Sequence, residues 1–177
     1  MQKDIDTIIT NYPKVRGFMF GCLTEDGDVN IDAMKILVSH CKGYCLTFNR
    51  AFDMCKDPIK ALTDIISIGF NRILTSGQKL NATLGQNLII ELQKQAAGRI
   101  VIVPCCGIDA NNIVDIKNAT GCTQFLIDAS ISTDSEMKYQ NNDVSMGGAS
   151  AFVNDEFAKT LSSGGVIKAT RALIDEL

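Results

Sequence analysis

Apolar and polar positions along this chain alternate between two kinds of segment. Five short runs are rich in β-branched or aromatic residues, and several are almost continuously apolar, as expected for strands buried on both faces. They are residues 15–21, 44–49, 72–77, 99–105 and 124–129. Between them, apolar residues recur every three or four positions, which is typical of amphipathic helices. The order of the segments predicts an α/β protein with five parallel strands joined by crossover helices.

Four of the predicted strands end at a regular spacing. Gly21, Asn49, Gly77 and Cys105 follow one another at intervals of 28 residues. An interval near 30 residues is typical of the eight-stranded βα barrel, which needs about 250 residues. Five strands in 177 residues therefore predict either an open sheet or a partial TIM-type βα barrel. Unpaired sheet edges would remain in both cases, so we expect the chain either to self-associate or to be poorly stable.

Capping and turn residues mark several predicted helix ends. Asp57 followed by Pro58 predicts the start of a helix, and Gly69 predicts its end. A closing helix is predicted near residues 165–177, after a polar loop over residues 130–150. The length of the chain predicts one domain over residues 1–177, which as a barrel would be incomplete.

Composition excludes several classes of function. The chain has 17 basic and 20 acidic residues and no basic cluster, so we expect no nucleic-acid partner. Its longest apolar runs are far shorter than the about 20 residues of a membrane helix, and its acidic N-terminal residues do not resemble a signal peptide. These features predict a cytoplasmic protein without a membrane partner. Because His40 is the only histidine, most histidine-based catalytic and zinc sites are excluded.

Cysteines are frequent, at seven, and their odd number predicts reduced thiols and not a disulfide framework. Cys22, Cys105 and Cys106 all fall at predicted carboxyl ends of strands. Because thiolates are preferred ligands of Cu(I), these three residues are candidate copper ligands. The alternative interpretation is that they are small buried apolar residues. Adjacent side chains on a strand point in opposite directions, so Cys105 and Cys106 converge only in a loop conformation.

Polar residues at the same strand ends are candidates for binding a small anionic ligand. Arg50, oriented by the carboxylate of Asp53, could hold an anion, or the two could form an ion pair between neighbouring loops. The segment Thr75, Ser76 and Gly77 could offer hydroxyls and an N–H group to a phosphate. Gly107 precedes a predicted helix whose N-terminus could do the same. The alternative for these positions is a turn with a helix cap.

Several strings in these loops resemble one known family. They are FGCLTEDGDV at residues 20–29, TFNRAFDMC at 47–55, RILTSGQ at 72–78 and VSMGG at 144–148. In order and spacing they are similar to strings of the copper homeostasis protein CutC family. The resemblance covers essentially the whole chain and corresponds to barrel strands four to eight of that family. It implies a TIM-type βα barrel and a cytoplasmic protein that binds and handles Cu(I).

The chain departs from this family at the predicted site. Asn49 stands where a histidine is usual, and Cys105 and Cys106 stand where glycines are usual. Asparagine does not act as a base or as a metal ligand in practice. Three functions therefore stay open. They are copper homeostasis through Cu(I) binding, a lyase- or isomerase-type enzyme with Arg50 and Asp53 acting on an anionic substrate, and a degenerate, inactive family member.

Overall fold

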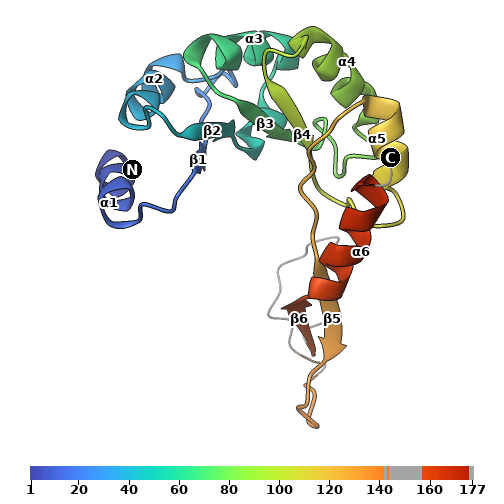
Figure 1. Cartoon of the computed structure of the whole chain (residues 1–177). Coiled ribbons are helices and arrows are strands. Elements are labelled where there is room, and N and C mark those ends of the chain that lie inside the picture. The colour runs from blue at the N-terminus through green and yellow to red at the C-terminus, as the bar shows by residue number, and fades with distance from the viewer. Residues whose placement is uncertain (142, 144–156, 176–177) are drawn as a thin grey trace. The chain divides into compact units, whose positions relative to one another are not determined.

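The structure is a computed structural model that describes residues 1–141, 143 and 157–175 (Figure 1). The chain divides into two compact units, Met1–Asp128 and Ala129–Leu177. The expected single domain over residues 1–177 stays a prediction.

The unit Met1–Asp128 is built on a four-stranded parallel sheet. Its strands lie in the order β1 (Gly17–Phe20), β2 (Cys45–Phe48), β3 (Arg72–Thr75) and β4 (Val101–Pro104). Its helices are α1 (Gln2–Asn11), α2 (Ile31–His40), α3 (Pro58–Ile68), α4 (Gln86–Ala96) and α5 (Ile113–Thr120). A crossover helix joins each strand to the next, and Figure 1 shows α2, α3 and α4 following one side of the sheet. The predicted α/β crossover architecture is therefore confirmed.

Strand alternation places the core between the sheet and its helices. Phe48, Ile73 and Ile102 are fully buried on one face of β2, β3 and β4. On β1, by contrast, Met19 is 55% exposed. Apolar burial is the main favourable term in folding, so the packing of helices against the first face stabilises the unit. The opposite face of the sheet is exposed to solvent at Met19 of β1.

Local capping chemistry explains the boundaries of α3. The side chain of Asp57 accepts hydrogen bonds from the backbone N–H groups of Ile59 and Lys60, at 3.1 and 2.9 Å. Pro58 occupies the first helical turn, where a missing N–H group costs nothing. Gly69 ends the helix in the left-handed conformation, with φ of 101°. Both predicted helix ends are confirmed.

The fifth predicted strand does not form. Residues 124–129 have no strand pairing, and one backbone hydrogen bond, from Leu126 N to Pro104 O at 3.0 Å, joins them to the end of β4. Leu126 is 47% exposed. A strand gains stability from side chains packed on its faces, and this segment leaves its central leucine half uncovered. The described sheet of Met1–Asp128 thus has four parallel strands, not five.

The unit Ala129–Leu177 contains β5 (Ser130–Asp134), β6 (Ala158–Ser162) and α6 (Gly164–Asp175). The two strands pair antiparallel, with Ser130 opposite Ser162 and Asp134 opposite Ala158. The polar loop predicted over 130–150 therefore begins with a strand, while the predicted closing helix is confirmed. The string at residues 144–148 lies outside the described residues. Among the helices that the structure describes, none has the length and apolar character needed to cross a membrane.

Candidate functional site

A short helix places two predicted site residues at the carboxyl end of β2. The 3₁₀ helix η1 (Arg50–Met54) follows the strand directly. Asn49 caps it, because its side-chain oxygen accepts a hydrogen bond from Ala51 N at 2.9 Å. Asparagine is among the preferred residues for this role. Asn49 therefore supports the turn that presents Arg50 and Asp53 side by side.

The carboxylate of Asp53 joins β2 to β3. Its Oδ1 accepts from Thr75 Oγ1 at 2.5 Å, Ser76 N at 3.0 Å and Gln78 N at 3.2 Å. Its Oδ2 accepts from Arg50 Nε at 2.9 Å, and also from Ser76 Oγ and Ser76 N at 3.0 and 3.1 Å. The Asp53 side chain is only 6% exposed. With both oxygens engaged, this carboxylate orients its neighbours and is poorly placed to act as a free base.

Arg50 presents a fixed positive charge at the same end of the sheet. Besides Asp53, its Nη2 donates to Ser76 Oγ at 3.1 Å, yet the side chain remains 47% exposed. The hydrogen bond to Asp53 raises the pKa of the guanidinium by more than burial lowers it. Arg50 is therefore positively charged at every physiological pH, and its Nε is held by the Asp53 carboxylate.

The two predicted glycine positions serve turns and packing. Gly77 has φ of 70°, and a Cβ atom there would overlap the carbonyl oxygen of Gly85. Its N–H donates to Thr75 Oγ1 at 2.9 Å and so is already engaged. Gly107 has φ of 67°, and its carbonyl accepts from Asn112 Nδ2 at 2.7 Å. These contacts favour the turn interpretation over a phosphate-binding loop.

Two adjacent thiols converge just after β4. The Sγ atoms of Cys105 and Cys106 lie 3.6 Å apart. Cys106 has φ of 69°, in the left-handed region, so the two side chains do not take the opposite directions of an extended strand. Cys105 is fully buried and Cys106 half-buried. Burial raises the pKa of the Cys105 thiol, and the neighbouring Cys106 raises it further.

The structure does not bring Cys22 to this pair. Cys22 follows β1, whereas the pair follows β4, and β2 and β3 lie between. Three strand spacings amount to about 14 Å. In the described part of the chain, no three His, Cys, Asp or Glu residues lie close enough to hold one metal ion. Of the three predicted copper ligands, only Cys105 and Cys106 therefore come together.

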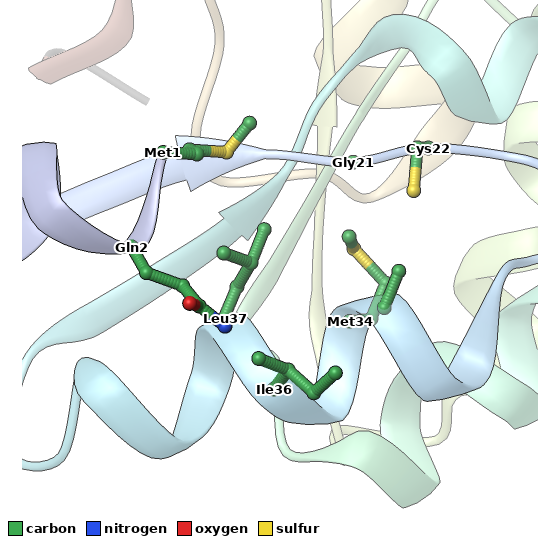
Figure 2. A pocket seen from close by; sticks show the side chains of 8 residues that line it. Met1, Gln2, Gly21, Cys22, Met34, Ile36 and Leu37 are labelled. Atoms are coloured by element: carbon green, nitrogen blue, oxygen red, sulfur yellow. The ribbon is translucent and has the colours of Figure 1, made fainter.

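Cys22 instead lines a separate pocket of about 410 Å³ at the end of β1. Figure 2 shows its sulfur and that of Met34, on α2, pointing toward one another. The other lining residues are Met1, Gln2, Gly21, Ala33, Ile36 and Leu37. Burial raises the pKa of the Cys22 thiol. Met34 lies in one of the segments whose apolar periodicity predicts a helix, and periodicity alone could not have shown that it faces Cys22.

Gln78 is a second site residue that sequence reasoning did not single out. Its backbone N–H contacts Asp53, and its side-chain Nε2 donates to the carbonyl of Cys55 at 2.6 Å. Its φ of 56° is rare for a residue other than glycine. Its place directly after Gly77, within one of the strings that resemble the family, was the available signal.

Comparison with known proteins gives a consistent result. A model of the CutC family matches residues 1–131. A family protein CutC of Bacteroides thetaiotaomicron is 48% identical over 132 residues, which cover 75% of this chain and 53% of the relative. The copper homeostasis protein cutC homolog of Mus musculus is 44% identical over 135 residues, covering 76% and 50%.

A solved structure agrees with the fold. A crystal structure assigned to the copper homeostasis protein CutC of Streptococcus agalactiae has a TM-score of 0.66 and is 26% identical, covering 70% of this chain and 60% of that one. The chain spans about half the length of the first two relatives. Because the family match covers well over half of the chain, the chain belongs to the CutC family.

Proposed function

We propose that this chain handles Cu(I) in copper homeostasis and that Cys105 and Cys106 hold the ion. The observation that carries the proposal is the 3.6 Å separation of the two Sγ atoms, which lie within electrostatic range of the charged Arg50. The copper homeostasis name of the mouse relative supports copper as the ion. Since this chain spans only part of that relative, the role is proposed for the described site alone.

The chemistry of the pair suits a soft, singly charged ion. Cu(I) prefers thiolate ligands, and two thiolates around one Cu(I) leave a net charge of −1. Arg50 lies close enough to both thiols to interact with them electrostatically and would balance that charge. The hydrogen bonds from Arg50 to Asp53 and Ser76 keep the guanidinium in place.

Proton release accompanies the proposed binding. Thiolates, not thiols, bind metals, so Cu(I) must displace the thiol protons. The raised pKa of Cys105 keeps its proton in place at neutral pH until the ion arrives. All seven cysteines are free, and a reducing cytoplasm would keep the pair in the thiol form. We therefore place the proposed function in the cytoplasm.

An anaerobic titration of the purified chain against a chromogenic Cu(I) chelator tests the proposal. We expect one tightly bound Cu(I) per chain and a loss of at least tenfold in affinity in Cys105→Ser and in Cys106→Ser. Cys41→Ser serves as the matched control, because Cys41 is equally buried but lies at the end of α2. Unchanged affinity in both pair variants would remove the basis for the proposal.

Anion binding at Arg50 is a second candidate. It is favoured by the Arg50 side chain, which is half exposed while its Nε bonds Asp53. Because Asp53 has no free oxygen, a lyase or isomerase step that uses it as base has little support. Titration with inorganic phosphate, followed by NMR, would show saturable shifts that Arg50→Gln removes. A chain that bound neither Cu(I) nor phosphate would instead fit a degenerate, inactive family member.

A further inference from the structure

A different pocket lies at the amino end of the sheet, opposite the end that carries Cys105 and Cys106. Its volume is about 350 Å³, in the range of pockets that hold small organic molecules. It is lined by residues at or near the starts of the first three strands, namely Arg16, Gly17, Phe18, Met19, Cys45, Thr47 and Arg72. This pocket is therefore separate from the proposed copper site.

The charge of this pocket opposes that of the whole chain. Two of its lining residues are arginines and none is acidic, whereas the chain has a net charge of −3. Within the described residues, neither Arg16 nor Arg72 forms an ion pair with a carboxylate. Two lining arginines without a carboxylate partner favour an anionic ligand, because charge of one sign concentrates counter-ions of the other.

A nucleophile lies beside Arg72 in the same pocket. The thiol of Cys45 is half-buried and accepts a hydrogen bond from Arg72 Nη1. Arg72 Nε donates to Gln124 Oε1 at 2.6 Å, and this bond fixes the guanidinium. On the other side, Cys45 N donates to the carbonyl of Arg16 at 3.1 Å, so the two residues are neighbours across β1 and β2.

Gly17 keeps the space next to this thiol open. It pairs with Cys45 in the β1–β2 register. A Cβ atom at position 17 would overlap the Cys45 carbonyl oxygen and lie 3.1 Å from the Cys45 Cβ atom. A side chain there would crowd the approach to the sulfur, and glycine avoids this.

We propose that Cys45 is a site of reversible modification by an anionic disulfide, meaning a disulfide whose two halves carry carboxylates. The sulfur of Cys45, after losing its proton to solvent, attacks one sulfur of the disulfide. A new S–S bond forms to Cys45, the original S–S bond breaks, and the other half leaves as a thiolate. Cys45 is thereby oxidised and the leaving half reduced. Arg16 and Arg72 bind the carboxylates and orient the attacked bond.

Charge selectivity provides the test. The intact chain is treated with oxidised glutathione, which carries carboxylates, and separately with the uncharged bis(2-hydroxyethyl) disulfide. Peptide mass spectrometry then follows the modification of each cysteine. With rates normalised to a small free thiol, we expect Cys45 to react first, and at least tenfold faster with the anionic reagent. High salt should reduce this preference, because it screens exposed charges.

Two variants separate the pocket from general surface charge. Arg16→Gln should reduce the preference for the anionic reagent to about threefold or less, while Lys14→Gln, which removes an exposed charge outside the pocket lining, should leave it unchanged. Circular dichroism confirms that both variants are folded. Equal rates with the two reagents, or faster modification of another cysteine, would overturn the proposal. If a Cys45→Ser variant still binds Cu(I), then the result for modification of Cys45 does not depend on the proposed copper site.

Discussion

Replacing Asp53 by asparagine tests whether its carboxylate joins the ends of β2 and β3. The substitution keeps the size of the side chain and one acceptor oxygen, which can still serve Thr75, the N–H of Ser76 and Gln78. It replaces the other oxygen by an amide nitrogen. That nitrogen would face two donor groups, Arg50 Nε and Ser76 N, which now approach the oxygen at 2.9 and 3.1 Å.

The size of the effect follows from those lost bonds. A hydrogen bond to a buried charged group contributes about 1.5–3 kcal/mol. Ser76 loses its N–H and Oγ contacts to this oxygen, but its N–H keeps the other oxygen at 3.0 Å, so Ser76 accounts for about 2 kcal/mol in total. The Arg50 side chain is 47% exposed, so its share is discounted for solvent screening to about 1 kcal/mol. We therefore expect Asp53→Asn to lower the free energy of unfolding by about 3 kcal/mol.

Urea denaturation followed by circular dichroism measures this change. The matched control is Asp64→Asn, because Asp64 bonds Lys60 Nζ at 2.8 Å on the surface of α3. An i,i+4 surface pair of this kind contributes about 0.5 kcal/mol. A loss below about 1 kcal/mol in Asp53→Asn, or one equal to that of the control, would refute the argument from buried acceptors.

Three further predictions concern the thiols and the sheet edge. Because the pKa of Cys105 is raised and Cu(I) displaces thiol protons, Cu(I) affinity should increase by about tenfold or more per unit between pH 6 and pH 8, measured by chelator competition. Burial raises the pKa of Cys55 to about 11. The protonated Cys55 thiol therefore stabilises the fold fully below the unfolded thiol pKa near 9, and this stabilisation is lost between about pH 9 and 11. Over that range the free energy of unfolding should fall by up to about 1.4 kcal/mol per pH unit. Chemical denaturation across that range should show the slope in the wild type and a shallower one in Cys55→Ala. Finally, the open edge at β1 should cause self-association, and Met19→Lys should reduce it in sedimentation velocity, since edge lysines oppose strand pairing; equal sedimentation of both proteins would contradict this.

The sequence predicted most of what depends on local pattern. The apolar runs located β1 to β4, and Asp57 and Gly69 located the ends of α3, because caps and periodicity act within a few residues. The pairing of Arg50 with Asp53 was also within reach, since the two residues are three positions apart in one turn.

Pairing between distant segments was not predictable in the same way. β5 lies in a segment that reads as a polar loop, and its partner β6 begins 28 residues after β5 begins. The strand predicted at residues 124–129 does not form, for a related reason. Its apolar residues indicate a strand, but they do not show which other segment would pack against it. Cys22 was grouped with the pair by its strand-end position, but the sheet order separates them.

The convergence of Cys105 and Cys106 depends on one backbone angle that no propensity predicts. Residues other than glycine pay about 1–2 kcal/mol for the left-handed conformation that Cys106 adopts, with φ of 69°. The resemblance to a family with glycines in this loop offers an explanation, because glycine occupies that conformation freely. Cysteine at this position keeps a turn suited to glycine and accepts the strain. Strain retained at a site is a reason to suspect function, and here the strained angle is the one that brings the two sulfur atoms together.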